Sequence, residues 1–237
     1  MNTAIIVAAG SGTRFKSDKP KQFVEIHGKP LIVHTLERFQ AAASIQAIIL
    51  VLPDGRIDEF AKITERFPFE KLFAVVAGGS TRAESVQKGF DAIAPATEIV
   101  AVHDGARPLV SPSEIDATVE KAKATGAACL VASVIDTIKT VRGDEIANTL
   151  DREKLRRALT PQAFRVEVLE RAFNVGDLSE SVTDECYLVE KLGHPIAFVE
   201  GSARNIKITH LDDLVLADAL LRNVKMTWPV GDFRFVR

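Results

Sequence analysis

The chain has 237 residues, of which 46% are hydrophobic and 26% are charged, a balance typical of a globular protein with a substantial core. Its formal net charge of -2 gives no electrostatic footprint for nonspecific nucleic-acid binding, so we expect no nucleic-acid partner. We also expect no membrane association, because no segment approaches the roughly 20 apolar residues that span a bilayer and no signal-peptide pattern is present. Cys129 and Cys186 lack metal-site or redox-motif spacing, which favours a cytoplasmic location.

The N-terminal segment is the first to carry a chemical signal. An apolar strand expected at Ala4–Ala8 leads directly into the glycine-rich sequence Gly10-Ser11-Gly12-Thr13-Arg14, and Lys21 follows. Glycine lets backbone N–H groups approach an anion closely, and the two cations supply positive charge. The segment is not a dinucleotide fingerprint, because Phe15 occupies the third glycine position, and the chain has no P-loop. We interpret it as a triphosphate-handling loop, with a plain strand-to-helix turn as the alternative.

Strand and helix signals alternate through the first half of the chain. Apolar runs predict further buried strands at Ala47–Leu52, Leu72–Val76, Ile99–Val102 and Ala127–Ser133. Amphipathic segments predict helices at Pro30–Ala42, Arg56–Arg66, Thr81–Ile93 and Pro112–Thr125, the last one capped by Ser111. Further along the chain we expect helices at Arg165–Phe173, Asp184–Lys191 and Leu211–Leu221 and a strand at Ile196–Val199. This order predicts an α/β fold with a mostly parallel sheet, helices on both faces and a ligand site at the carboxyl ends of the strands.

A different pattern follows the fifth strand. Val134–Val141 alternates β-branched and polar residues, Arg142–Glu145 is a turn signal, and Ile146–Leu150 returns as a second strand. We predict a protruding two-stranded arm at about 134–152, which needs a partner surface because an isolated hairpin is marginal. The alternative is a hairpin folded onto its own domain. We expect one domain over 1–224 that includes the arm, followed by a tail over 225–237 with no assigned role.

Two segments at strand ends carry candidate site residues. Asp104 follows a buried strand, where it is placed to hold Mg²⁺ together with substrate phosphates, although a turn-capping role is the alternative. The second glycine-rich turn, Gly78–Ser85, has N–H groups that we expect to face a base or a phosphate. Either Ser80 or Thr81 then caps the helix that follows.

Two cations further along the chain are also candidates. Lys207 lies in the apolar segment Asn205–Thr209, which we expect to be a short strand, and it suits a site that faces a phosphate. The alternative is an edge-strand lysine that discourages aggregation. Arg152 follows the arm and is able to clamp a second phosphate, or is a solvated surface residue.

Eight segments, in a single order along the chain, together resemble the 2-C-methyl-D-erythritol 4-phosphate cytidylyltransferase family. They are Ala8–Arg14, Pro20–Gln22, Gly78–Ser85, His103–Pro108, Asp136–Lys139, Leu159–Gln162, Thr183–Glu185 and Asn205–Thr209. The resemblance spans residues 3–221. It implies a Rossmann-like fold and a homodimer whose arm reaches the partner's site. The implied reaction joins CTP and methylerythritol phosphate, a polyol phosphate, into a CDP-alcohol with release of pyrophosphate, with Mg²⁺ as cofactor.

The resemblance also implies roles for individual residues. Those implied to bind the nucleotide are Ala8, Ala9, Gly10, Ser11, Gly12, Thr13, Gly79, Arg82, Ser85, Asp104 and Gly105, with Asp104 also near the metal. Those implied to act in catalysis are Arg14 and Lys21, which stabilise transition-state charge, and Arg152 and Lys207, which position the attacking phosphate. The polyol-phosphate site would contain Arg107, Asp136, Thr137, Arg152, Thr160, Thr183 and Lys207. Thr137 and Arg152 would serve the neighbouring subunit.

Three other functions compete with this assignment. A ribitol-5-phosphate cytidylyltransferase shares the fold, the nucleotide and most motifs, and only the acceptor pocket differs. A sugar-phosphate nucleotidyltransferase that uses another NTP is a more distant rival. A non-catalytic nucleotide-binding module is opposed by the joint presence of Arg14, Lys21, Asp104 and Lys207.

Overall fold

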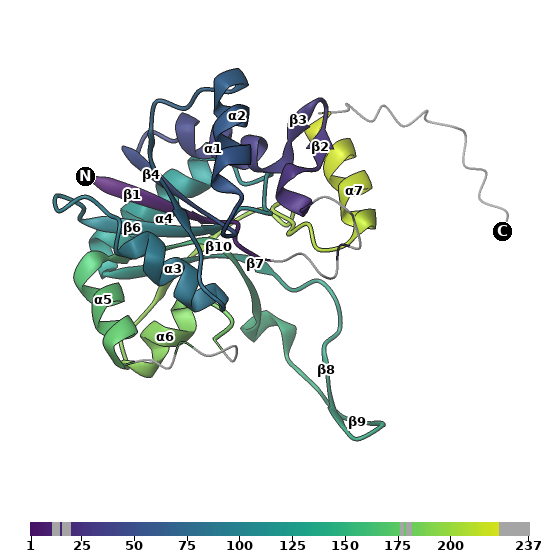
Figure 1. Cartoon of the computed structure of the whole chain (residues 1–237). Helices are drawn as coiled ribbons and strands as arrows, with labels where there is room; N and C mark the ends of the chain where they lie inside the picture. The colour runs from purple at the N-terminus through teal and green to yellow at the C-terminus, as the bar shows by residue number, and fades with distance from the viewer. Residues whose placement is uncertain (11–14, 16–19, 176–177, 179–181, 223–237) are drawn as a thin grey trace, which may run out of the picture.

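The computed structural model describes residues 1–10, 15, 20–175, 178 and 182–222, and its centre is a seven-stranded sheet (Figure 1). In spatial order the strands are β11 (Ala197–Glu200), β7 (Ala127–Ser133), β10 (Arg156–Arg165), β6 (Ile99–Asp104), β1 (Asn2–Val7), β4 (Ala47–Leu52) and β5 (Leu72–Ala77). β10 runs antiparallel to both of its neighbours, and the other pairings are parallel. The predicted mostly parallel sheet is confirmed.

Helices cover both faces of the sheet, as Figure 1 shows. One face packs against α1 (Leu31–Ala41), α2 (Ile57–Arg66) and α4 (Pro112–Thr125), and the other against α3 (Arg82–Phe90), α5 (Val166–Val175) and α6 (Glu185–Lys191). Successive residues of β1 serve different cores, because Ile5 packs on one face and Ile6 on the other. Burial on both faces explains why these strands are continuous apolar runs.

The helix that ends the described chain closes one side of the sheet. It is α7 (Leu211–Leu221), and it packs with the short hairpin of β2 (Glu25–Ile26) and β3 (Lys29–Pro30). Their small core contains Phe15, Leu31, Ile208 and Ala217. This core fixes the segment before α7 beside the carboxyl end of β6, since Ile208 N donates to the Ala106 carbonyl at 2.8 Å.

The predicted helix caps are confirmed. Thr81 caps α3 and Ser111 caps α4, each in a reciprocal capping box with a glutamate three residues later. Asp184 caps α6 by accepting a hydrogen bond from Tyr187 N at 2.9 Å. These caps set where each helix begins, and α3 and α6 begin beside the cavity described below.

One strand was missed in the sequence, and one expected strand is absent. The central strand β10 was not predicted, because Pro161 lies inside it and proline argues against a central strand. The ladder between β10 and β7 shifts register between Ala158 and Gln162, so the proline lies where the ladder is already interrupted. The expected strand at Asn205–Thr209 is absent, since these residues belong to no helix or strand. Lys207 therefore lies on a loop, and the edge-strand alternative fails with the strand itself.

The arm is confirmed as a protruding hairpin (Figure 1). β8 (Lys139–Arg142) and β9 (Glu145–Thr149) pair antiparallel, and every residue from 141 to 150 is exposed. The hairpin is thus not folded onto its own sheet. The short helix η3 (Arg152–Lys154) leads back to β10.

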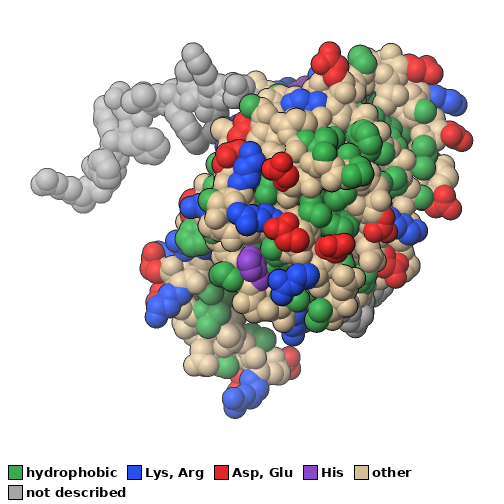
Figure 2. All heavy atoms as spheres, turned by 90° about the vertical axis from the view of Figure 1, so that its left-hand side faces the viewer, with side chains coloured by type: hydrophobic (Ala, Val, Ile, Leu, Met, Phe, Trp, Pro, Cys, Tyr) green, Lys and Arg blue, Asp and Glu red, His purple; other side chains and the backbone are tan. Residues whose placement is uncertain are grey.

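The surface carries mixed charge. In Figure 2, acidic and basic side chains are interspersed over the visible face rather than gathered by sign, in keeping with the net charge of -2. Across the part of the chain that the structure describes, no helix is both long and apolar enough to cross a membrane. The tail over 225–237 lies outside the described residues.

Candidate active site

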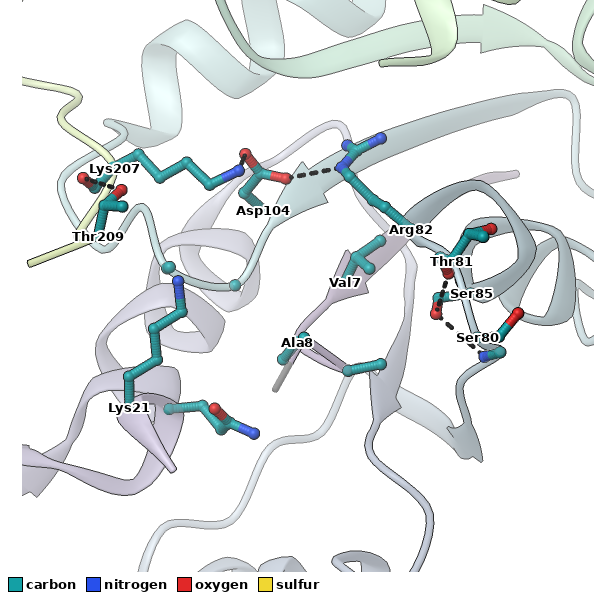
Figure 3. Close-up of a pocket in the computed structure, with 16 residues that line it drawn as sticks. Val7, Ala8, Lys21, Ser80, Thr81, Arg82, Ser85, Asp104, Lys207 and Thr209 are labelled. Carbon is teal, nitrogen blue, oxygen red and sulfur yellow. Dashed lines mark hydrogen bonds and ion pairs between the residues drawn. The ribbon is translucent and has the colours of Figure 1, made fainter. Parts of the chain in front are cut away.

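A cavity of ≈ 460 Å³ opens at the carboxyl ends of the central parallel strands (Figure 3). Its lining comes from the end of β1, the turn that precedes α3, and the end of β6. These residues are Val7, Ala8, Ala9, Gly10, Gly79, Ser80, Thr81, Arg82, Ser85, Asp104, Gly105 and Ala106, joined by Lys21, Gln22, Lys207 and Thr209. The position agrees with the rule that open α/β sheets bind ligands beyond the carboxyl ends of their strands.

Asp104, the last residue of β6, is the charged centre of this cavity. Its Oδ1 accepts from Arg82 Nε at 3.2 Å, and its Oδ2 accepts from Lys207 Nζ at 2.9 Å and from Arg107 Nε at 3.4 Å. Figure 3 shows Lys207 and Arg82 approaching the carboxylate from opposite sides. Because Asp104 binds three cationic side chains rather than the N–H groups of a turn, its side chain organises the site and is not a turn cap.

The charge balance of this cluster favours an anionic ligand. Burial raises the pKa of the Asp104 carboxyl, but the attraction of Arg82, Lys207 and Arg107 outweighs burial and holds that pKa well below its ordinary range. Asp104 is therefore ionised at neutral pH. Three cations against two carboxylates, Asp104 and the Glu185 side chain that also binds Arg82, leave net positive charge beside the cavity, and Lys21 adds to it. Such preorganised charge suits a phosphate-bearing substrate.

The residues present fit a magnesium ion only in part. Asp104 supplies a carboxylate of the kind that Mg²⁺ binds, but both of its oxygens already accept from cationic side chains. Mg²⁺ commonly binds one or two carboxylates and completes its shell with substrate phosphates and water. Within the described residues, no group of three or more His, Cys, Asp or Glu side chains is arranged to hold a metal by itself. Asp104 would thus be one ligand in a site that the substrate completes.

Behind Asp104, a buried hydrogen-bond chain fixes the backbone. The Thr160 hydroxyl accepts from Asp104 N at 3.1 Å and lies 2.9 Å from His103 Nδ1, while His103 Nε2 lies 3.1 Å from the Arg107 carbonyl. Burial lowers the pKa of His103 to about 4. The contacts are all satisfied if neutral His103 carries its proton on Nε2 and accepts from Thr160. Thr160, predicted to bind the polyol phosphate, is buried and engaged behind the cavity lining.

The second glycine-rich turn does not offer its N–H groups to a ligand. Gly79 N donates to Ser85 Oγ at 3.0 Å, and Ser80 N donates to the Glu84 carboxylate at 2.8 Å. The glycine at 78 serves close packing instead, because a Cβ there would collide with Ala9 Cβ. The segment lines the cavity with Gly79, Ser80, Thr81, Arg82 and Ser85, and Arg82 is the residue through which it brings charge to the cavity.

The N-terminal half of the predicted site is only partly described. Ala8, Ala9 and Gly10 line the cavity as predicted, whereas Ser11, Gly12, Thr13 and Arg14 lie outside the described residues. Lys21 belongs to the short helix η2 (Lys21–Phe23) and lines the cavity, where its Nζ donates to the Ile208 carbonyl at 3.1 Å.

The predicted acceptor residues divide into two groups. Arg107 and Lys207 belong to the Asp104 cluster. Asp136, Thr137 and Arg152 belong to the arm region and are exposed, and Arg152 donates to the Ile135 carbonyl at 2.8 Å. Thr183 is exposed just before α6. The described lining of the cavity includes none of these last four residues.

The sequence model of the family IspD, 2-C-methyl-D-erythritol 4-phosphate cytidylyltransferase, matches residues 2–223. The chain belongs to this family. A 2-C-methyl-D-erythritol 4-phosphate cytidylyltransferase of Bacillus velezensis is 42% identical over 223 residues, which cover 92% of this chain and 94% of the relative. A bifunctional IspD/IspF enzyme of Desulfotalea psychrophila is also 42% identical, and the match covers 94% of this chain but 58% of that longer protein.

Solved structures agree with the family assignment. A 4-diphosphocytidyl-2C-methyl-D-erythritol synthase from Anaerococcus prevotii has a TM-score of 0.81 at 29% identity, covering 94% of this chain and 96% of the other. The 2-C-methyl-D-erythritol 4-phosphate cytidylyltransferase of Thermus thermophilus has a TM-score of 0.74 at 34% identity, covering 94% and 100%. The overall fold of this chain is thus that of solved members of the family.

Sequence reasoning missed Glu185, the first residue of α6, which binds Arg82 behind the cavity lining. It also missed the lining residues Val7, Gln22, Ser80, Thr81, Ala106 and Thr209. The side chain of Glu185 is completely buried and accepts from Arg82 Nη1 at 2.6 Å. Local sequence indicated only an acidic residue in the first turn of a helix. The missed signal is periodicity, since Glu185 shares the buried side of α6 with Leu188 and Val189 at i+3 and i+4. A glutamate on a buried helix face normally has a cationic partner.

Proposed function

We propose that the protein transfers a cytidylyl group from CTP to 2-C-methyl-D-erythritol 4-phosphate, giving 4-diphosphocytidyl-2-C-methyl-D-erythritol and pyrophosphate. The observation that carries the proposal is the Asp104 cluster, in which Arg82, Arg107 and Lys207 meet one carboxylate in a cavity that Lys21 also lines. Family membership supplies the substrates, because the relatives carry this activity in their names.

In the proposed reaction, an oxygen of the acceptor phosphate forms a bond to the α-phosphorus of CTP. The bond from that phosphorus to the oxygen bridging to the β-phosphorus breaks, and pyrophosphate leaves with the electron pair. Enzymes accelerate such transfers mainly by positioning and by stabilising charge. Lys21 and Arg14 are proposed to stabilise the charge that develops on the transferred group and on pyrophosphate, while Lys207 orients the attacking phosphate.

Mg²⁺ is the proposed cofactor, and Asp104 is the residue that would hold it. When bound, the ion would neutralise charge on the triphosphate oxygens. Metal binding is testable without turnover, because Mg²⁺ added with CTP should protect the fold against thermal unfolding more than CTP alone does. Asp104→Asn should remove that extra protection, and retention of it in the variant would contradict the assigned ligand.

The arm is proposed to form a homodimer and to carry Asp136, Thr137 and Arg152 to the partner's acceptor pocket. Ile135 is 78% exposed, Val141 70% and Ile146 68%, so the arm presents apolar side chains that the described part of its own subunit leaves uncovered. The test is complementation between two impaired variants, Lys21→Ala and Arg152→Ala, assayed at a methylerythritol phosphate concentration below the raised KM of Arg152→Ala. If the arm acts in the partner's site, mixing the two should restore part of the activity; no restoration in proven mixed dimers would place Arg152 in its own subunit's site.

The decisive experiment is pyrophosphate release with CTP, Mg²⁺ and methylerythritol phosphate, with each omitted in turn. We expect release only with all three. Ribitol 5-phosphate tests the alternative acceptor, which the names of the relatives do not favour, and turnover of ribitol phosphate alone would overturn the choice of acceptor. Preference for UTP or ATP would overturn the choice of nucleotide. The proposal assigns the activity to one domain over 1–224 and to the cytoplasm, where Cys129 and Cys186, both free and buried, stay reduced.

A further inference from the structure

Arg82 is held between two carboxylates that come from different parts of the fold. Its Nε donates to Asp104 at the end of β6 at 3.2 Å, and its Nη1 donates to Glu185 at the start of α6 at 2.6 Å. Arg82 itself begins α3. The guanidinium therefore joins three elements at the wall of the cavity, and each of its two bonds fixes a different nitrogen.

Glu185 occupies a costly position. Its side chain is completely buried, and within the described residues its second oxygen, Oε2, has no hydrogen-bond partner. Burial raises the pKa of this carboxyl, and Arg82 opposes the rise. A buried carboxylate with one unsatisfied oxygen is a poor means of stabilising a fold compared with an apolar residue of similar size. This cost is understandable if the orientation of Arg82 matters to the site.

Asp104 alone would hold Arg82 in a different way. Arginine prefers to bind a carboxylate through two parallel N–H donors, but Oδ2 of Asp104 already accepts from Lys207 and Arg107. Glu185 takes one side of the guanidinium and leaves Arg82 with a single bond to Oδ1. The second carboxylate thus fixes the orientation of the guanidinium through a different nitrogen.

We propose that Glu185 is a positioning residue for the nucleotide half of the site, acting through Arg82. It holds the guanidinium against the cavity wall, where the resemblance implies contact with the nucleotide. The inference rests on the proposed function, because it assumes that CTP is the ligand that Arg82 meets.

A double-mutant cycle in steady-state kinetics tests this role. We expect Glu185→Gln to raise the KM for CTP about tenfold, with kcat and the KM for methylerythritol phosphate changed by less than about twofold. In an Arg82→Gln background, the same substitution should change the KM for CTP by less than about twofold, because the residue through which Glu185 acts is gone. A residue that only stabilises the fold would lower the melting temperature without this dependence on Arg82.

Two further variants complete the design. Glu200→Gln is the matched control, since Glu200 pairs with Arg156 at 3.2 Å on the surface, outside the cavity lining, and should leave all kinetic constants unchanged. Glu185→Asp retains the charge with a shorter side chain and should give a smaller rise in the KM for CTP than Glu185→Gln does; if Glu185→Gln does not fold, the cycle is run with Glu185→Asp.

The outcomes separate the two proposals. Equal effects of the Glu185 substitution with and without Arg82, or a KM for CTP that does not change, would overturn the positioning role. Failure of the wild-type protein to use CTP would instead overturn the proposed function.

Discussion

The cavity and the arm carry charged residues in opposite ways. Around the cavity, Arg82 has a side chain 22% exposed and Arg107 one 12% exposed, and Asp104 and Glu185 hold them from separate elements. On the arm side, Arg152 is 52% exposed and its nearest acid, Glu153, is 85% exposed. A buried charge needs an opposite charge from the same fold, whereas an exposed charge is solvated and is free to bind a group on another molecule.

This difference divides the expected effects of substitution. Residues around the cavity act in both stability and activity, because removing one leaves a buried partner unpaired. Residues of the arm contribute little to the stability of their own subunit and are free to act on another surface. The following predictions compare the two regions directly, starting with the largest effect.

Lys21→Ala should have the largest effect on the rate. Lys21 lines the cavity beside Asp104 and Lys207, and loss of a preorganised charge-stabilising donor costs on the order of 2.7–4 kcal/mol of transition-state stabilisation. We expect kcat to fall by the factor that corresponds to this loss, while CTP binding, measured by calorimetry, weakens much less. Lys62→Ala, on the exposed side of α2, is the control. Equal losses in binding and in rate would contradict a role in the transition state.

Asp104→Asn should destabilise the protein by about 3 kcal/mol, the low end for breaking a buried ion pair, because Lys207 is partly exposed. The equivalent change in the arm, Asp144→Asn at an exposed turn, should cost less than about 0.5 kcal/mol. Denaturant unfolding measures both. The pKa of Asp104 is depressed, so its stabilisation is present above the ordinary value of 3.8 and is lost only as the pH falls through the folded-state pKa. The difference in the free energy of unfolding between Asp104→Asn and the wild type should therefore be constant between pH 6 and pH 8. A difference that varies with pH in this range would contradict an Asp104 that is fully ionised there.

His103 should make the cavity region sensitive to mild acid. Its pKa falls from an ordinary 6.5 to about 4 because of burial, so the unfolded chain binds a proton in a range where the folded protein does not. The contribution of neutral His103 to the free energy of unfolding is complete above pH 6.5 and is lost as the pH falls toward 4. The loss amounts to about 2 kcal/mol between pH 7.5 and pH 5. The free energies of unfolding of the wild type and of His103→Gln, measured at both pH values, isolate the contribution of His103. A variant with the wild-type pH dependence would exclude His103 as its source.

The sequence predicted the cavity's parts better than their mutual contacts. Asp104 and Lys21 were found because strand ends and glycine-rich turns mark the ligand edge of an α/β sheet. Lys207 was found as a lysine in an apolar segment, although the strand expected there is absent. The sharing of Asp104 by three cations was not predictable, since Arg82 and Lys207 are 125 residues apart and only the tertiary structure brings them together. The burial of Glu185 could have been predicted from the periodicity of α6, but its pairing with Arg82 could not, because Arg82 lies on another helix.

The errors in secondary structure have local physical causes. β10 was missed because Pro161 occurs where the ladder with β7 is interrupted, and local propensity carries no record of that interruption. The segment at Asn205–Thr209 has the composition of a strand, but its Ile208 is buried against α7 and bonds to the Ala106 turn rather than to a neighbouring strand. The arm was predictable because its alternation and turn are local signals.

Arg152→Ala has the smallest expected effect on the subunit itself and is the sharpest probe of the comparison. Its guanidinium is 52% exposed and bonds to the Ile135 carbonyl within the same arm, so we expect the free energy of unfolding to change by no more than about 0.5 kcal/mol. Activity should respond differently, because Arg152 is proposed to bind the acceptor phosphate. The KM for methylerythritol phosphate should rise while the KM for CTP stays constant, and Lys154→Ala, two residues away and 85% exposed, should change neither. A rise in the KM for CTP would show that Arg152 also acts in nucleotide binding, and would contradict the assignment of separate roles to the cavity and the arm.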